Sequence, residues 1–158
     1  MATEPAVRPI QQSATVRRPV EEAFRIFTEE IGSWWPLASY SKAYSERSGE
    51  RVTAESVVLE GRVGGQIYEV MSDGTEASWG EVVAWDPPNR LVLAWNPQQR
   101  QASTEVEVRF TAQGEGTLVE VDHRGWENLG EEAQEIREDY VKGWPIVLGR
   151  FAEWRESA

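Results

Sequence analysis

The chain of 158 residues has no cysteine and a single histidine, His123. Disulfide bonds and thiolate chemistry are therefore excluded, and the lack of cysteine is typical of proteins in a reducing compartment. One histidine leaves only carboxylates as further metal ligands, so we expect no metal site. The sequence also lacks a Gly-x-Ser-x-Gly motif, and a hydrolytic triad around the histidine has no support.

Basic side chains are few as well. The sequence has 16 Lys and Arg against 27 Asp and Glu, which gives a formal net charge of −11. Binding to nucleic acid or to an anionic membrane surface is not expected, because both depend on clustered Lys and Arg. No stretch approaches the roughly 20 apolar residues of a membrane span, and the N-terminus lacks the apolar core of a signal peptide. We therefore expect a cytoplasmic protein without a membrane span.

A phosphate-binding loop is also missing from the sequence. Gly61-x-x-Gly64-Gly65 lies between two predicted strands and is not followed by a helix, so we expect no nucleotide or other cofactor. The length fits one domain over residues 1–158. Within it, residues 1–10 contain Pro5 and Pro9 and are expected to form a loose N-terminal tail.

Alternating apolar and polar residues predict seven strands. Residues 64–71, 79–85 and 91–95 form an antiparallel meander. Its turns have chemical causes, because Asp73-Gly74 supplies the positive φ of a tight hairpin and Pro87-Pro88 cannot continue a strand ladder. Four further strands are predicted at residues 11–17, 51–59, 104–110 and 117–125, and residues 37–50 and 98–102 are predicted as irregular segments.

Two segments have the 3.6-residue periodicity of amphipathic helices. The first begins near Pro19 and buries Val20, Ala23, Phe24, Phe27 and Ile31. The second covers residues 130–156, with Ile136, Tyr140, Trp144, Leu148 and Phe151 on one stripe and a bend expected at residues 143–145. The order strand, helix, six strands, long helix predicts an α+β fold in which a curved seven-stranded antiparallel sheet wraps around the C-terminal helix. A cavity between sheet and helix is expected as the ligand site.

Short motifs along the chain resemble a known family. They are residues 31–36 (IGSWWP), 63–69 (VGGQIYE), 79–82 (WGEV), 85–88 (WDPP), 104–108 (TEVEV), 123–126 (HRGW) and 143–145 (GWP). Together they resemble the helix-grip fold of START-like (SRPBCC) domains and, within it, the small relatives of the heat-shock chaperone ATPase activators. The chain departs from the family pattern at Tyr40-Ser41, where a His-Ser pair is common, and at Gly61, where proline is usual. The resemblance implies a fold and a hydrophobic cavity, and no activity.

Tryptophan is abundant, with eight in the chain, and most of these rings are expected in the core. Trp34, Trp35 and Trp144 are the first candidates for ligand contact, because they lie at the predicted loop opening and on the gripping helix. The full predicted binding set is Trp34, Trp35, Tyr68, Glu69, Trp79, Trp95, His123, Trp126, Tyr140 and Trp144.

The roles of three titratable residues stay open. For His123, the sequence favours a core histidine bonded to a backbone carbonyl or carboxylate over one that orients a ligand or acts as an acid or base. For Glu69 and Glu81, a solvent-facing side chain is favoured over a carboxylate turned into the cavity.

Three functions follow from these features. The preferred hypothesis is a binding protein for a small apolar or aromatic ligand, with no catalytic residue and with His123 as the polar anchor. The second is regulation of a chaperone through an exposed acidic surface, and the third is a cyclase- or aromatase-like reaction that uses His123 with Glu69 or Glu81. Both a monomer and a homodimer are compatible with the sequence.

Overall fold

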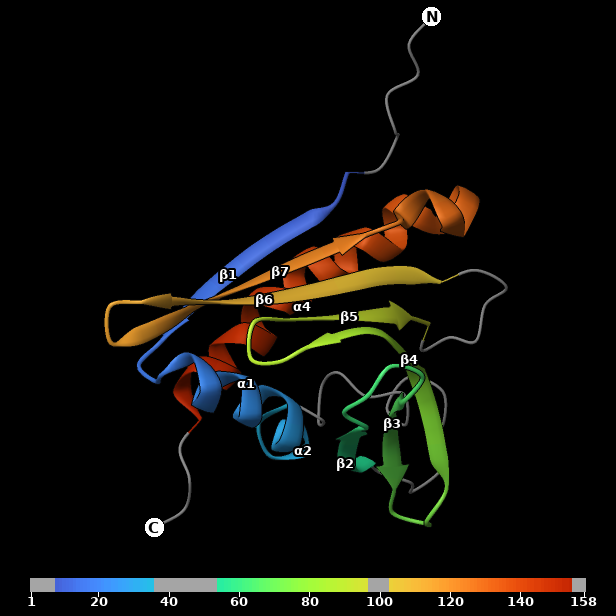
Figure 1. The fold of residues 1–158 in the computed structure, drawn as a ribbon. Coiled ribbons are helices and arrows are strands. Elements are labelled where there is room, and N and C mark those ends of the chain that lie inside the picture. Colours follow the sequence, from blue (N-terminus) through green and yellow to red (C-terminus); the bar gives the residue numbers. More distant parts are fainter. Residues whose placement is uncertain (1–7, 36–53, 97–102, 155–158) are drawn as a thin grey trace, which may run out of the picture.

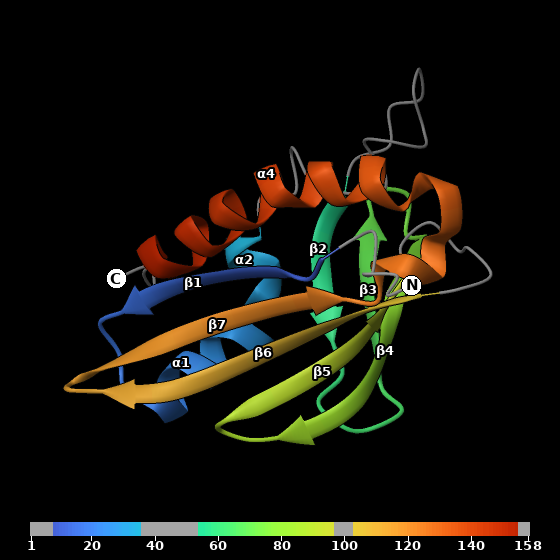
Figure 2. The same cartoon turned by 90° about the horizontal axis from the view of Figure 1, so that it is seen from above.

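The computed structural model describes residues 8–35, 54–96 and 103–154. Seven strands form one antiparallel sheet in the order β1-β7-β6-β5-β4-β3-β2. The elements are β1 (Ile10–Val16), α1 (Val20–Glu29), α2 (Ile31–Trp34), β2 (Ala54–Leu59), β3 (Gln66–Met71), β4 (Glu76–Asp86), β5 (Arg90–Trp95), β6 (Thr104–Gln113), β7 (Gly116–Arg124), the 3-10 helix η1 (Trp126–Glu132) and α4 (Ala133–Glu153). The sheet curls, and the long α4 packs along it (Figure 1, Figure 2). The predicted α+β helix-grip fold is confirmed.

The strands begin and end within three residues of their predicted bounds. β1 starts at Ile10, whose side chain is buried, and therefore includes the last residue of the predicted tail. Residues 1–7 of that tail lie outside the described residues, as do residues 51–53 of the second predicted strand and the segments predicted as irregular at 37–50 and 98–102.

Irregular pairing gives the sheet its curvature. The strand register shifts between Ala54 and Ser56, between Ile67 and Tyr68, and between Val82 and Ala84. Bulges of this kind increase the local twist and bend the strand that carries them. Gly80, beside the second shift, has no room for a side chain, because an added Cβ would lie 1.8 Å from the carbonyl oxygen of Ala94.

The helices begin and end where local chemistry requires. Pro19 precedes α1, and Glu21 and Glu22 in its first turn complement the helix dipole. The C-terminal helix starts later than predicted, because Gly130 has φ 68° and ψ −136°, which are not helical values. A kink at Gly130 interrupts η1, which covers residues 126–132, and α4 begins at Ala133. α4 is continuous through residues 143–145, where a bend was predicted, and Pro145 lies inside it.

The buried side chains of the helices face the inner side of the sheet. Phe24 and Phe27 of α1 contact Phe110 of β6, with ring centroids 5.1 and 5.5 Å apart. The contribution of α4 to the core consists of Ala133, Trp144, Val147, Leu148 and Phe151. Within the described ranges, no helix combines the length and the apolar character needed to cross a membrane.

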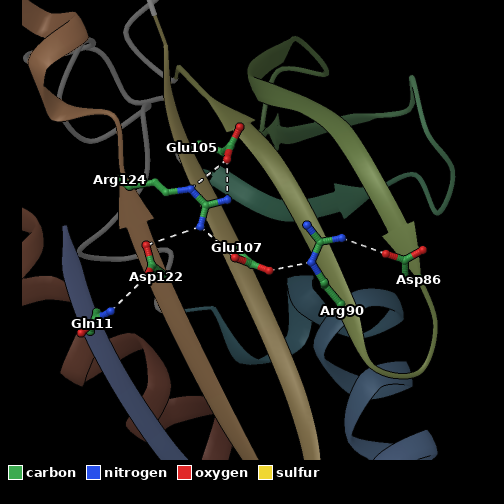
Figure 3. A network of polar contacts seen from close by, with 7 residues as sticks. All are labelled: Gln11, Asp86, Arg90, Glu105, Glu107, Asp122 and Arg124. Carbon is green, nitrogen blue, oxygen red and sulfur yellow. Dashed lines mark hydrogen bonds and ion pairs between the residues drawn. The ribbon is translucent and has the colours of Figure 1, made fainter.

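The outer side of the sheet carries a band of ion pairs (Figure 3). Glu107 of β6 lies at its centre, where it accepts hydrogen bonds from Arg90 at 2.6 Å and from Arg124 at 2.7 Å. Burial alone would raise the pKa of Glu107, but the hydrogen bonds from the two arginines outweigh it and hold that pKa below its usual range. Asp86 and Glu105 extend the band on either side. Among the described residues, paired charges therefore line this part of the outer face.

The ion-pair band predicts unequal costs for removing its carboxylates. Glu107→Gln should destabilise the fold by about 1–3 kcal/mol, because a nearly buried, doubly hydrogen-bonded charge is lost. Glu105→Gln, at a side chain that is 44% exposed, should cost less than about 1 kcal/mol. Urea unfolding of both variants measures the difference, and equal costs would contradict the central role of Glu107.

The β3–β4 hairpin supports a second prediction. Gly74 has φ 87°, its N–H donates to the carbonyl of Met71 at 3.0 Å, and the Asp73 carboxylate accepts from the N–H of Thr75. Gly74→Val should cost about 1–2 kcal/mol, because a β-branched residue resists a positive φ. Gly74→Asn is the control and should cost less, since asparagine tolerates this region. No atom lies within 4 Å of a Cβ added at Gly74, so a steric clash cannot cause the loss of stability. Equal melting temperatures for the valine and asparagine variants would contradict a cost that comes from the backbone conformation.

Candidate functional site

Aromatic rings form a continuous network through the core. Each ring contacts the next at centroid distances between 4.2 and 6.3 Å. The network contains Trp85, Phe24, Phe110, Phe27, Phe151, Trp34, Trp35, Trp79, Trp95, Trp144, His123, Trp126 and Tyr140. Trp154 lies outside this network, where Arg18 approaches its ring at 5.7 Å.

Four indoles form the centre of this network, and we call them the indole cluster: Trp35, Trp79, Trp95 and Trp144. Trp35 directly follows α2, whereas the other three belong to β4, β5 and α4. The Trp35 ring lies 5.0 Å from Trp79 and 6.2 Å from both Trp95 and Trp144. Trp79 and Trp144 lie 5.7 and 6.1 Å from Trp95. Segments far apart in sequence thus bring these four buried rings together.

Three indole N–H groups of the cluster donate to polar side chains. Trp79 Nε1 donates to Glu69 Oε1 at 2.9 Å, and Trp95 Nε1 donates to the Tyr140 hydroxyl at 3.0 Å. Trp144 Nε1 donates to His123 Nδ1 at 3.1 Å. Since an indole N–H can only donate, each of these contacts also fixes the partner atom as an acceptor.

Glu69 lies fully inside the core, with 0% of its surface exposed. The interpretation that favoured a solvent-facing Glu69 is therefore wrong. The strand β3 turns Ile67, Glu69 and Met71 inward and leaves Tyr68 half-buried on the opposite face, since successive strand residues alternate. Tyr68 thus lies apart from the indole cluster. Glu81 is exposed, as the sequence favoured.

His123 is fully buried, and both ring nitrogens are hydrogen-bonded within the protein. Nε2 lies 2.7 Å from Thr104 Oγ1, and Nδ1 accepts from Trp144. The imidazole lies 4.2 Å from the Trp126 ring, and Trp126 Nε1 donates to the His123 carbonyl at 2.8 Å. The sequence favoured a buried histidine bonded to a carbonyl or carboxylate. Its ring partners are instead a hydroxyl and an indole.

Burial lowers the pKa of His123 to about 3. The imidazole is therefore neutral near pH 7, and protonation would place an N–H opposite the N–H of Trp144. A base with so low a pKa is poorly matched to proton transfer at neutral pH. No hydrogen bond joins His123 to Glu69 or Glu81, so the described residues do not form the acid–base pair that a cyclase-like reaction was expected to use.

The structure brings together nine of the ten predicted binding residues. Trp34 and Trp126 support the cluster from two sides, since Trp34 packs on Trp35 and Trp126 packs on His123. Tyr68 is the exception. Thr104 was missed, although it begins β6 and is buried on the same face as Val106, Val108 and Phe110. In the same described part of the chain, no group of three or more His, Asp or Glu could hold a metal ion.

The comparison with protein families now decides the relationship. Residues 17–155 match the family described as activator of Hsp90 ATPase homolog 1-like proteins. The chain belongs to this family. The resemblance inferred from the short motifs is thereby confirmed, although the departure at Tyr40-Ser41 lies outside the described residues.

Solved structures similar to this family member include proteins of different kinds. An anthrahydroquino-gamma-pyrone synthase, solved as a complex, is 30% identical with a TM-score of 0.62 over 92% of this chain and 96% of that chain. The self-sacrificing resistance protein CalC from Micromonospora echinospora is 26% identical with a TM-score of 0.62 over 92% of each chain. The Aha1 dimer from Colwellia psychrerythraea shares the fold, at 13% identity and a TM-score of 0.66 over 93% and 95%. A comparison with curated proteins gives no match.

The low pKa of His123 predicts a loss of stability in acid. A histidine of the unfolded chain titrates near pH 6.5, whereas folded His123 stays neutral down to about pH 3. Below pH 6.5 only the unfolded state gains this proton, so the free energy of unfolding falls by about 1.4 kcal/mol per pH unit. At pH 5 the loss relative to neutral pH is about 2 kcal/mol.

Urea unfolding at pH 7.5 and pH 5 of the wild type and His123→Asn isolates this effect, because the carboxylates are common to both proteins. We expect the wild type to lose about 2 kcal/mol more than the variant. An NMR titration of the single histidine gives an independent check, and a folded-state pKa near 6.5 would contradict the prediction.

Proposed function

We propose that this protein binds a small, largely apolar aromatic molecule at the indole cluster, between the sheet and α4. The observation that carries the proposal is the convergence of Trp35, Trp79, Trp95 and Trp144 from separate elements. Their mutual interplanar angles run from 39° to 87°, so no two of these rings stack in parallel. Aromatic ligands would contact such rings by offset or edge-to-face packing.

Three polar side chains border the proposed site: Glu69, Tyr140 and, behind the rings, His123. The Tyr140 ring lies 5.0 Å from His123, and its hydroxyl accepts from Trp95. His123 is uncharged at neutral pH, because burial lowers the pKa of its imidazole. Ligand recognition would therefore rest mainly on ring packing. Trp34 and Trp126 would act as supports behind the rings, and Tyr68 falls outside the site.

A similar solved structure supports the proposal of an aromatic ligand. The synthase that is 30% identical carries in its name an anthrahydroquinone joined to a pyrone, which is a flat fused-ring compound. The same likeness favours a cyclase-type reaction as a second candidate. In this second candidate function, the protein would act mainly by holding a reactive substrate in one geometry. His123 would contribute little, because its low pKa makes it poorly suited to acid–base catalysis at neutral pH.

Binding of a neutral naphthalene derivative tests the proposal. Titration with 2-naphthol should quench tryptophan fluorescence with a saturable dependence on concentration. Trp35→Leu should weaken this binding by about tenfold, because one ring of the site is lost. Trp154→Leu is the matched control and should bind like the wild type, since Trp154 lies outside the aromatic network.

Thermal melts of both variants would verify that they are folded at the temperature of the assay. A folded wild type that binds neither 2-naphthol nor larger fused-ring compounds would overturn the proposal. That result would instead favour action through the protein surface, as in the regulation of a chaperone.

A further inference from the structure

A chain of hydrogen bonds links the indole of Trp144 to the main chain of Trp95 through residues behind the rings. Trp144 Nε1 lies 3.1 Å from His123 Nδ1, and His123 Nε2 lies 2.7 Å from Thr104 Oγ1. Thr104 Oγ1 lies 3.3 Å from the carbonyl oxygen of Trp95. The chain starts on α4, crosses β7 and β6, and ends on β5. Its two ends belong to Trp144 and Trp95, whose rings lie 6.1 Å apart.

The direction of every hydrogen bond in this chain is fixed by elementary chemistry. The indole nitrogen of Trp144 can only donate, so Nδ1 of His123 has no proton. A neutral imidazole carries its proton on the other nitrogen, so Nε2 donates to Thr104. The Thr104 hydroxyl has one proton, and the carbonyl of Trp95 can only accept it. All donors therefore point the same way, from Trp144 toward Trp95.

Thr104 completes the chain in the direction that the Trp144 N–H sets. Its hydroxyl accepts from Nε2 and donates to a main-chain oxygen, so a proton on Nε2 satisfies all the atoms. The opposite tautomer would place two N–H groups against each other at Trp144, and the Thr104 hydroxyl would have to turn from the Trp95 carbonyl to Nε2. Polar atoms this deeply buried are costly when they lack a partner. One tautomer and one ring orientation are thus strongly favoured.

We propose that Thr104 and His123 are positioning residues for the binding site, which together hold the indole of Trp144 at a fixed angle to β5, the strand that carries Trp95. This role rests on the proposed function. Thr104 and His123 act from behind the rings, and the ligand would contact the indole that they orient. A site with fixed rings binds more tightly than one whose rings must be ordered first.

The tautomer is measured directly on the wild type. The chain has a single histidine, so labelling with 15N-histidine gives the signals of one imidazole. We expect Nε2 to carry the proton and Nδ1 to have none. A proton on Nδ1, or two tautomers in similar amounts, would overturn the proposal without any reference to a ligand.

The role in binding is measured with variants of Thr104. Thr104→Val keeps the shape and removes the hydroxyl, and it should weaken 2-naphthol binding about tenfold and shift the Trp144 indole N–H resonance. Thr104→Ser restores the hydroxyl and should bind within about twofold of the wild type. If Thr104→Val proves unfolded, Thr104→Ala removes the same hydroxyl without touching a ring of the site and should show the same loss.

The outcomes separate the two proposals. A folded Thr104→Val with wild-type affinity, or a Thr104→Ser as weak as Thr104→Val, would overturn the positioning role while the binding function stands. A wild type that shows the expected tautomer and binds no aromatic probe would overturn the binding function, and the positioning role in binding falls with it.

Discussion

An indole ring can be buried at low cost only if its N–H finds an acceptor, and this requirement organises the core. Five tryptophans meet it with five acceptors: Trp34 with the Ile26 carbonyl, Trp79 with Glu69, Trp95 with Tyr140, Trp126 with the His123 carbonyl, and Trp144 with the His123 ring. The polar groups inside this otherwise apolar core thus have a common cause. Glu69 and His123 are buried and Tyr140 is partly buried where indoles need them. The same contacts tie α2 to α1 and the sheet to α4.

The requirement also explains why the two faces of the sheet differ. On the inner face, polar atoms are few, and the described side-chain bonds among the aromatic residues join neutral donors to fixed acceptors. On the outer face, polar atoms are charged and form the band around Glu107, where water screens the cost of charge. In the β6–β7 pairing, Val106 faces His123 inward while Glu107 faces Asp122 outward. A one-residue slip in this pairing would exchange the two layers, so the polar contacts specify the register along with the apolar ones.

The sequence predicted the fold well because the fold depends on local periodicity and turn chemistry, which a single sequence contains. Alternation located β6 and β7, and Asp73-Gly74 located the hairpin. The sequence predicted the start of α4 less well, because Gly130 could belong to either a helix or a turn. The polarity of the core was harder still. Alternation could place Glu69 on one face of β3 but not decide which face was inward, since Tyr68 and Val70 made the other face apolar too. The partners of His123 come from β6 and α4, and no local pattern reports such contacts.

The arrangement also bears on the difference between binding and catalysis on this scaffold. A residue used for proton transfer needs a pKa near the working pH and an atom directed at the substrate. His123 has neither, because burial depresses its pKa and protein groups occupy both ring nitrogens. These same properties suit a fixed support, since a neutral ring with two committed nitrogens holds one orientation. Because the His123 nitrogens are bonded within the protein, the proposed site would offer a ligand few polar contacts. Selectivity among ligands would then come from the shape of the aromatic surface. A neutral histidine with both nitrogens bonded inside the protein is therefore better suited to orienting its neighbours than to transferring a proton.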